Sequence, residues 1–240
     1  YCMKVGLVLE GGGMRGLYTA GVLDVMMDNH FMPDVVCGTS ASVTFGVNLL
    51  SQQKGRVLRY NCRYVGDKRY ISLHSWLTTG NMINKDFAYD LLPRSLDPFD
   101  EEQYERSPAV FYATITNMHT GEAEYVQITD TWEQMDVIRA SASLPIICQP
   151  VEWNGEKYLD GGLADSVPLR HSIETGHKKN VLILTRPYGY RKKFPSESAR
   201  MYIVVRDKDG ISMSGIDVIL QRKPISGGNW TTVTSGKSPL

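Results

Sequence analysis

Cysteine is scarce in this sequence, and its few thiols are isolated from one another. The 240 residues include four cysteines, with no CxxC pair and no histidine beside them at the spacing of metal ligands. Isolated thiols argue against a disulfide framework and against a cysteine-based zinc site, and they favour a reducing compartment. We therefore expect a cytoplasmic protein that binds no metal. The cysteines are Cys2, Cys37, Cys62 and Cys148.

An excess of charge of one sign and long apolar runs are also missing. The 26 Lys and Arg residues balance the 26 Asp and Glu residues, so composition gives no support for nucleic acid as a partner. No apolar run reaches the roughly 18 residues that could cross a bilayer, so we expect any membrane contact to be peripheral. The sequence predicts no oligomeric state. What it does have is an apolar fraction of 42%, enough to form a packed core.

Short apolar strands alternate with helical segments through the first two hundred residues. Each of the first two strands runs into a turn of small residues, and a helical pattern follows each turn. This order predicts an α/β domain with a mostly parallel central sheet. The predicted strands are 4–10, 34–40, 109–117, 122–128 and 180–186, with helices at 15–30, 41–53 and 136–145 and a hairpin at 151–162.

The residue composition and the periodicity of the sequence change near residue 201. Residues 201–240 alternate with a period of two, are rich in Ser and Thr, and carry turn pairs at Asp209–Gly210 and Gly227–Gly228. Such a pattern predicts a β-rich segment without an amphipathic helix. We therefore expect a first domain at 1–200, with the boundary near 190–205, and a β-rich tail at 201–240.

The first turn, GGGMRG, has three possible uses. Gly11, Gly13 and Gly16 satisfy the GxGxxG pattern of dinucleotide sites. Such a site also needs an acid at the end of the second strand, whereas the nearest acid here, Asp34, stands at the beginning of that strand. A glycine turn that merely lets a strand and a helix pack closely is a second interpretation. The third is a set of N–H groups that bind a transient oxyanion.

The second turn, GTSAS, favours the oxyanion interpretation. Ser40 lies between an apolar strand and a helix, where a nucleophile elbow would lift its hydroxyl to the edge of the sheet. An ordinary helix N-cap is the alternative role for this serine. Adjacent parallel strands place their C-terminal turns side by side, so Gly12, Gly13 and Ala41 could offer N–H donors near the same carbonyl oxygen.

A serine nucleophile needs a base, and the histidines offer no clear candidate. His171 and His177 follow Ser40 in an order compatible with a triad, but they flank a polar segment and are predicted to be solvated. Asp160, in YLDGG, ends an apolar strand and precedes two glycines, which allows close approach to other backbone. A plain hairpin turn is the alternative for this motif. An unperturbed Asp is a weak base, so burial would have to raise its pKa.

Four motifs in order, GGGMRG, GTSAS, ASASLP and YLDGG, resemble those of the patatin-like phospholipase family, most nearly its bacterial cytoplasmic esterases. The resemblance covers about residues 4–190. It implies a three-layer α/β/α fold in which Ser40 is the nucleophile and Asp160 activates it directly, without a metal or other cofactor. It further implies hydrolysis of a phospholipid or another fatty-acyl ester through an acyl-serine. The implied oxyanion hole comprises Gly11, Gly12 and Gly13, with Arg15 close behind.

Two departures from the family pattern leave an alternative open. Ser42 stands where the family elbow has glycine, which predicts modest strain and a weakened enzyme. The tail at 201–240 stands where family members continue with helices that cover the sheet. A catalytically silent lipid-binding protein on the same fold is therefore the alternative function.

Three further segments complete the predictions. Arg56, Arg59 and Arg63 share one helical face, which we interpret as solvated, with lipid head groups as the alternative partner. Residues 74–87 are predicted to form a lid or a wall of the acyl pocket. Residues 90–108 are acidic and interrupted by proline, and they are predicted to form a connector at the surface.

Overall fold

A seven-stranded sheet organises the first of the two units into which the chain divides, Tyr1–Arg186 and Pro187–Leu240. The computed structural model describes residues 4–187, 190, 202–206, 217–222 and 231–237. The strand order is β5-β6-β3-β2-β1-β7, with β4 paired to β3. Strands β7, β1, β2 and β3 are parallel, and β4, β6 and β5 extend the sheet in antiparallel pairs. The strands are β1 (Val5–Leu9), β2 (Val35–Thr39), β3 (Val110–Asn117), β4 (Ala123–Ile128), β5 (Val151–Trp153), β6 (Glu156–Asp160) and β7 (Lys179–Ile183).

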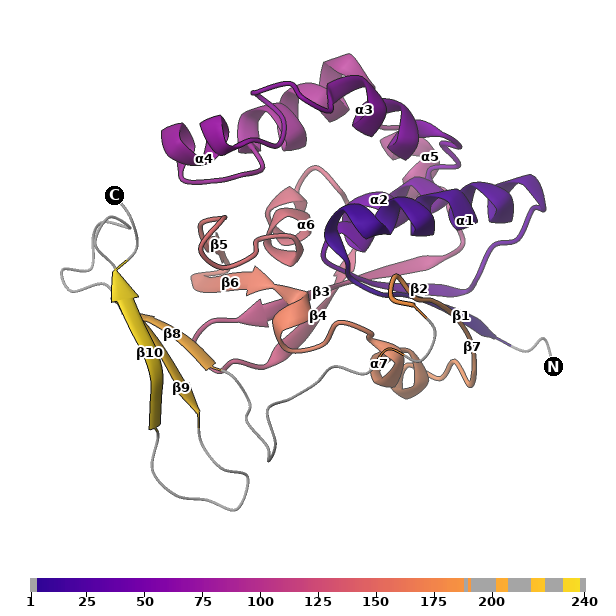
Figure 1. The fold of residues 1–240 in the computed structure, drawn as a ribbon. Coiled ribbons are helices and arrows are strands. Elements are labelled where there is room, and N and C mark those ends of the chain that lie inside the picture. Colours follow the sequence, from indigo (N-terminus) through magenta and orange to yellow (C-terminus); the bar gives the residue numbers. More distant parts are fainter. Residues whose placement is uncertain (1–3, 188–189, 191–201, 207–216, 223–230, 238–240) are drawn as a thin grey trace. The chain divides into compact units, whose positions relative to one another are not determined.

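Helices flank both faces of this sheet. Figure 1 shows α1, α2 and α6 over one face and α7 on the other, with α3 and α4 farther from the sheet than α1 and α2. The α/β class with a flanked central sheet is thereby confirmed. No helix within the described residues has the length and apolar character needed to span a membrane. The helices are η1 (Gly13–Arg15), α1 (Gly16–Asp28), α2 (Ala41–Leu50), α3 (Arg56–Tyr64), α4 (Leu73–Thr79), the π-helix η2 (Asp86–Leu96), α5 (Glu101–Glu105), α6 (Met135–Ser141), η3 (Gly161–Leu163) and α7 (Leu169–Glu174).

The apolar runs of β1 and β2 are explained by burial on both faces. Leu7, Leu9 and Val36 are inaccessible to solvent, and Phe111 of β3 packs in the same cluster. A strand that is covered on both sides has no solvent face to alternate with, so its sequence is continuously apolar. A second apolar cluster joins α1 and α2 to the outer helical layer. Its members are Ala20, Phe45, Val57, Tyr60, Tyr64, Tyr70, Phe87 and Leu92.

Strand β3 brings the ends of two distant strands together. Thr114 pairs with Thr39 of β2 on one side and with β4 on the other, and the next residue, Ile115, pairs with Asp160 of β6 and again with β4. Strands β2 and β6 therefore share one edge of β3. Because β2 is parallel to β3 and β6 is antiparallel to it, their C-terminal ends meet. The residues that follow Thr39 and that end β6 are thus placed side by side.

The second unit contains a three-stranded antiparallel sheet in the order β10-β9-β8. Its strands are β8 (Tyr202–Arg206), β9 (Asp217–Arg222) and β10 (Thr231–Lys237), with a register shift between Thr232 and Thr234. Within the predicted β-rich segment at 201–240, the residues that the structure describes all lie in these three strands. The turn pairs Asp209–Gly210 and Gly227–Gly228 lie outside the described residues.

The predicted solvated arginine stripe is wrong at Arg56. Its side chain is only 4% exposed, and it donates hydrogen bonds to Asn48 Oδ1 and to the Asp97 carbonyl oxygen. Burial lowers the pKa of this guanidinium, while the nearby Asp97 carboxylate raises it. Arg59, one turn on, is exposed and forms two hydrogen bonds with that carboxylate. Only the Arg59 and Arg63 part of the stripe faces water.

The predicted surface connector at 90–108 is also wrong in part. Its first half continues the π-helix η2 through Pro93, and Leu92 and Tyr104 are buried. The Tyr104 hydroxyl donates to the Ile128 carbonyl oxygen at 2.8 Å. A widened helical turn accommodates a proline that would interrupt regular i to i−4 hydrogen bonding, so this segment packs on the core rather than covering it loosely.

Candidate functional site

Ser40 occupies a sharp turn between β2 and α2. Its backbone has φ 60° and ψ −137°, a conformation that L residues rarely adopt and that costs about 1–3 kcal/mol. The Ser40 N–H donates to Ser141 Oγ at 2.9 Å, and Ser141 Oγ in turn donates to the Thr114 carbonyl oxygen at 2.6 Å. This buried relay ties the strained turn to α6 and β3, which holds the turn in its unusual conformation.

The Ser40 hydroxyl donates a hydrogen bond to the Asp160 carboxylate. Ser40 Oγ lies 2.7 Å from Asp160 Oδ2, and the other carboxylate oxygen accepts the Gly162 N–H at 2.7 Å. Asp160 is 1% exposed, and this burial raises its pKa to about 6, although the bonds from Ser40 and Gly162 act in the opposite direction. The carboxylate is therefore held in place by one oxygen and faces Ser40 with the other.

The backbone of Asp160 is fixed by neighbours on both sides. Its N–H donates to the Ser143 carbonyl oxygen at 2.9 Å, and its own carbonyl oxygen accepts from Thr116 Oγ1 at 2.8 Å. Gly161 follows, and a Cβ there would lie 2.6 Å from the Thr114 carbonyl carbon. Only glycine permits β6 to end this close to β3, which is the reason for the first glycine in the YLDGG motif.

The glycine loop lies beside Ser40. A Cβ on Gly11 would lie 3.1 Å from the Ser40 Cβ, and a Cβ on Gly12 would lie 2.5 Å from Thr185 Oγ1. Gly13 has φ +56°, in the left-handed region. Among the described residues, no group accepts the N–H of Gly12, Gly13 or Ala41. The structure thus brings three unpaired backbone donors to the neighbourhood of the Ser40 turn.

Glu10, directly before the loop, was not predicted to have a role and is nearly buried. Its Oε2 accepts the N–H of Thr185 at 2.5 Å and that of Arg186 at 3.2 Å. The Gly11 N–H, implied above to belong to the oxyanion hole, is already engaged, because it donates to the Ser166 carbonyl oxygen at 3.1 Å. These contacts fasten the start of the loop to the end of β7 and to the segment after Asp160.

Arg15 and Ser42 differ in their exposure and in their hydrogen bonds. The Arg15 side chain is exposed at the end of η1 and pairs with no described residue, so its placement behind the loop stays a prediction. Ser42 is buried in the first turn of α2 without a positive φ, and its Oγ donates to the Glu10 carbonyl oxygen at 2.6 Å. The predicted strain at Ser42 is therefore wrong, because the hydroxyl finds an acceptor in the space that glycine would leave empty.

A cavity of about 270 Å³ begins at the glycine loop and the start of α2. Apolar side chains of α2, η2, α6 and the segment 144–148 line most of it, and Arg56, Tyr60 and Phe99 lie among its walls. Met82 and Ile83, from the segment predicted to form a lid or pocket wall, line it too. An apolar cavity next to a hydroxyl and free N–H groups can hold a hydrocarbon chain while its polar end stays at the turn.

The histidines lie elsewhere. His177 is buried, and its Nδ1 lies 3.2 Å from Thr175 Oγ1; the His171 ring stacks on Tyr125 with the centroids 4.1 Å apart. The prediction that both are solvated is wrong. None of the five histidines, all within the described ranges, forms a hydrogen bond with Ser40 or Asp160. In the described part of the chain, no group of three His, Cys, Asp or Glu side chains could hold a metal ion.

The family model for patatin-like phospholipases matches residues 7–173. This chain belongs to the patatin-like phospholipase family. The matched span includes the glycine loop, the turn at Ser40, the relay through Ser141 and the strand that ends at Asp160. In this patatin-like domain, the contacts that Ser40, Ser141 and Asp160 make with one another and with β3 thus fall inside the matched span.

Curated relatives extend well beyond the length of this patatin-like chain. The uncharacterized protein YjjU of Escherichia coli is 32% identical over 190 residues, which are 77% of this chain and 52% of YjjU. The lysophospholipase nte1 of Emericella nidulans is 30% identical over 184 residues, 72% of this chain and 11% of that protein. NTE1 of Saccharomyces cerevisiae, also a lysophospholipase, is 28% identical over 170 residues, 69% and 10% of the two chains. The chain therefore spans about half of YjjU and about a tenth of the lysophospholipases.

Removing the Ser141 hydroxyl should destabilise the Ser40 turn. In Ser141→Ala, the buried Ser40 N–H loses its acceptor, which should lower the free energy of unfolding by about 1–3 kcal/mol. Urea denaturation followed by circular dichroism would measure this. Ser143→Ala is the matched control, since within the described residues its hydroxyl bonds the Arg139 carbonyl oxygen alone, and that oxygen keeps the Ala142 N–H as a partner. Equal losses in the two variants would contradict the relay.

Proposed function

We propose that this chain is a lipid acyl hydrolase that cleaves fatty-acyl esters through Ser40 and Asp160. The observation that carries the proposal is the 2.7 Å hydrogen bond from Ser40 Oγ to a buried carboxylate whose pKa is raised to about 6. A base near neutral pKa accepts a serine proton far better than an ordinary aspartate does. Family membership and the lysophospholipases among its relatives support a lipid ester as the substrate.

In the first half of the proposed reaction, Ser40 Oγ attacks the ester carbonyl carbon and its proton passes to Asp160 Oδ2. The carbonyl oxygen becomes an oxyanion, which the N–H groups of Gly12, Gly13 and Ala41 can stabilise because no described residue accepts a hydrogen bond from them. The intermediate collapses as the Asp160 proton moves to the leaving alcohol oxygen. The alcohol departs, and the acyl group remains on Ser40.

In the second half, water attacks the acyl carbon of the acyl-serine and gives its proton to Asp160. The oxyanion forms again against the same N–H donors. Collapse then releases the fatty acid as the Asp160 proton returns to Ser40 Oγ, which restores the starting state. Each half-reaction uses only Oδ2, because Oδ1 is engaged by the Gly162 N–H.

The acyl chain would lie in the cavity that starts at Gly13 and Ala41. Its apolar walls suit hydrocarbon, and it begins beside the turn that carries Ser40. The first substrates to test are therefore a lysophospholipid and a series of p-nitrophenyl esters from acetate to palmitate.

The deciding experiment compares the wild type with Ser40→Ala. We expect the wild type to release fatty acid from lysophosphatidylcholine and p-nitrophenol from the ester series, and the folded variant to release neither above background. Labelling of the wild type by a fluorophosphonate, mapped to Ser40, would show an activated serine independently of substrate choice. A wild type that is neither labelled nor active would overturn the proposal and favour the silent lipid-binding protein.

The pH dependence of kcat/KM tests Asp160 separately. Asp160 must be ionised to accept the proton, so the rate should fall as pH falls through about 6, and it should be flat above that value up to pH 8. Release of p-nitrophenol, read at its isosbestic wavelength, gives the profile without interference from the product's own ionisation. A rate that is unchanged between pH 8 and pH 5 would contradict a base of this pKa.

A further inference from the structure

Helix α4 presents its apolar side chains outward and its polar side chain inward. Leu73 and Leu77, one turn apart, are 62% and 65% exposed. Ser75, on the opposite side, is 1% exposed, and its Oγ donates to the Asn81 carbonyl oxygen at 2.7 Å. A surface helix of a globular domain normally buries its apolar stripe. The reversed arrangement means that the hydroxyl groups attach α4 to the protein and the leucines face whatever lies outside.

A second apolar segment lies next to this helix. Trp76 of α4 donates its indole N–H to the Ile146 carbonyl oxygen at 3.0 Å. Ile146 has φ +75°, which is strained for a β-branched residue, and its side chain is 62% exposed. Leu144, two residues earlier, is also exposed. These five residues form what we call the apolar rim: Leu73, Trp76, Leu77, Leu144 and Ile146.

The apolar rim borders the cavity described above. Leu144 belongs to both, and Ile147, next to Ile146, lines the cavity. Ile71 and Met82, on either side of α4 in the sequence, line it as well, and the Met82 N–H donates to the Ile147 carbonyl oxygen at 2.7 Å. The same two segments thus form a wall of the cavity with one set of side chains and an outward apolar surface with another.

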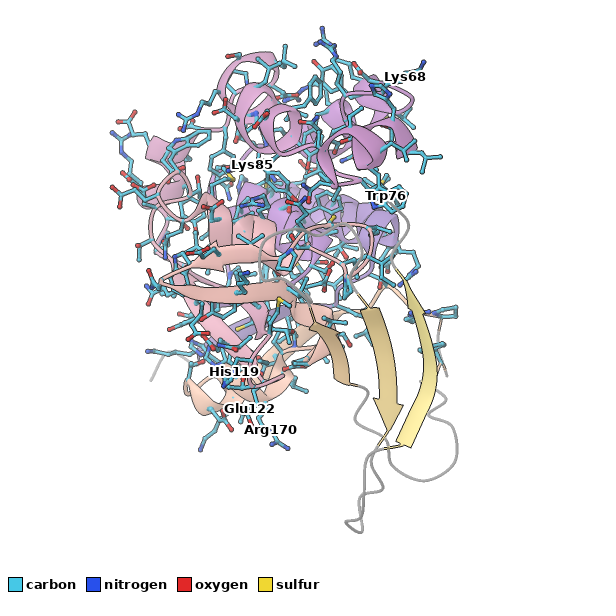
Figure 2. The ribbon with its side chains drawn as sticks, turned by 90° about the vertical axis from the view of Figure 1, so that its left-hand side faces the viewer. Lys68, Trp76, Lys85, His119, Glu122 and Arg170 are labelled. Carbon is cyan, nitrogen blue, oxygen red and sulfur yellow. The ribbon has the colours of Figure 1, made fainter. Side chains whose placement is uncertain are left out.

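Neither segment of the apolar rim contains an acidic residue, although Asp67 and Asp86 directly flank the first segment. Residues 68–85 contain three Lys and Arg and no Asp or Glu, and residues 140–151 contain no charged residue. Of the three, Arg69 pairs with Asp67, while Lys68 and Lys85 form no ion pair within the described residues. Figure 2 shows Lys68, Trp76 and Lys85 together in the upper, helical part of the first unit, far from His119, Glu122 and Arg170.

We propose that the apolar rim docks the protein on an anionic lipid surface. Exposed leucines and an isoleucine can enter the acyl boundary of a bilayer, a tryptophan whose N–H is already satisfied suits the interface, and flanking lysines attract anionic head groups. Continuity with the cavity favours lipid over a protein partner, because an acyl chain leaving the bilayer at the rim would enter the cavity without crossing water. This purpose rests on the proposed hydrolase function, but the docking itself does not.

The test measures vesicle binding without turnover. The full chain carrying Ser40→Ala would be sedimented with sucrose-loaded vesicles of phosphatidylcholine alone and of phosphatidylcholine mixed with phosphatidylglycerol. We expect binding to the anionic vesicles that weakens in high salt. Adding Leu73→Ser and Leu77→Ser should reduce the partition coefficient at least about tenfold. Ile173→Ser on α7, which removes an equally apolar exposed side chain from the other face of the sheet, should leave it unchanged.

Ester hydrolysis by the chain with Ser40 intact separates docking from catalysis. Leu73→Ser and Leu77→Ser should leave hydrolysis of soluble p-nitrophenyl acetate unchanged and lower hydrolysis of vesicle lipid. If no ester is hydrolysed but binding depends on the leucines, the hydrolase proposal fails and the docking surface stands. Vesicle binding that is absent, or that is insensitive to both leucines, overturns the docking surface. A dimer in lipid-free sedimentation velocity that Leu77→Ser dissociates would assign the apolar rim to a second copy of the chain instead.

Discussion

Asp160→Asn is expected to lower kcat/KM for ester hydrolysis by about 100- to 10,000-fold while making the folded protein more stable. The amide can keep both contacts, with its oxygen accepting the Gly162 N–H and its NH2 group donating to Ser40 Oγ, but it does not take the proton, so the general-base contribution is lost. Kinetics on a p-nitrophenyl ester would measure the first effect. A variant that keeps its activity would exclude Asp160 as the base.

The gain in stability follows from the raised pKa. The folded-state pKa of Asp160 is about 6, against 3.8 for the free side chain, so the fold favours the neutral form. The neutral Asp160 side chain stabilises the folded protein fully below pH 3.8, and this stabilisation is lost as pH rises through about 6. A difference of about two pKa units corresponds to about 3 kcal/mol lost at pH 7. An amide is uncharged at every pH, so Asp160→Asn should avoid that loss.

Urea denaturation at pH 7 and at pH 4.5 would check this. The variant should exceed the wild type at pH 7 and approach it at pH 4.5. Asp165→Asn is the matched control, because this neighbouring carboxylate accepts a similar pair of hydrogen bonds, from the Tyr125 hydroxyl and the Val167 N–H, but is only half-buried, so its substitution should not raise the stability at pH 7. Lower stability of Asp160→Asn at pH 7 would show that the carboxylate is better solvated than its burial indicates.

Gly161→Ala should destabilise the protein by more than about 4 kcal/mol and abolish activity. Its Cβ would lie 2.6 Å from the Thr114 carbonyl carbon, and closer still to the carbonyl oxygen. The Thr114 carbonyl belongs to the backbone of β3, and Gly161 directly follows β6, which is paired with β3. Neither backbone can move without separating β6 from β3. An effect this large belongs to the small set of substitutions that break a specific backbone contact.

The measurement is the urea midpoint of any soluble Gly161→Ala protein, with the soluble fraction after expression as a second readout. Gly21→Ala in α1 is the control, because a Cβ there meets nothing within 4 Å and alanine should stabilise the helix by about 0.5–1 kcal/mol. A Gly161→Ala protein that is as stable as the wild type would mean that β6 does not end against Thr114.

The strands were predictable because burial leaves a local mark on the sequence. A parallel strand covered on both faces is a short apolar run, and residues 4–10 and 34–40 have that form next to small-residue turns. Neither run, however, indicates which strand it pairs with in the sheet. That β6 is antiparallel and shares an edge of β3 with β2 depends on pairings across more than forty residues. The contact between Ser40 and Asp160 could therefore be expected from family resemblance but not from the pattern alone.

The wrong predictions share a different cause. Arg56 has the same spacing as Arg59 and Arg63, and its burial depends on partners such as the Asp97 carbonyl oxygen and the Asn48 side chain. Pro93 has the local mark of a helix end, yet it lies within the π-helix η2. At Arg56 the local rule about exposure was overridden by hydrogen bonds to Asn48 and Asp97. At Pro93 the rule about helix termination was overridden by the wider turns of the π-helix. Ser141 escaped notice for the same reason, since its role lies in its partners rather than in its motif.

Strands β2 and β6 meet end to end along one edge of β3, and this arrangement affects the order of folding. The hydrogen bond between Ser40 and Asp160 joins residues 120 positions apart, and it can form only after β3 has paired with both strands. Pairings of such sequence separation form slowly, because a long loop must close before any contact is gained. During refolding from urea, helical signal should therefore return before reactivity toward a fluorophosphonate does. The rate at which Ser40 becomes reactive toward the fluorophosphonate would then report the last step in the assembly of the sheet.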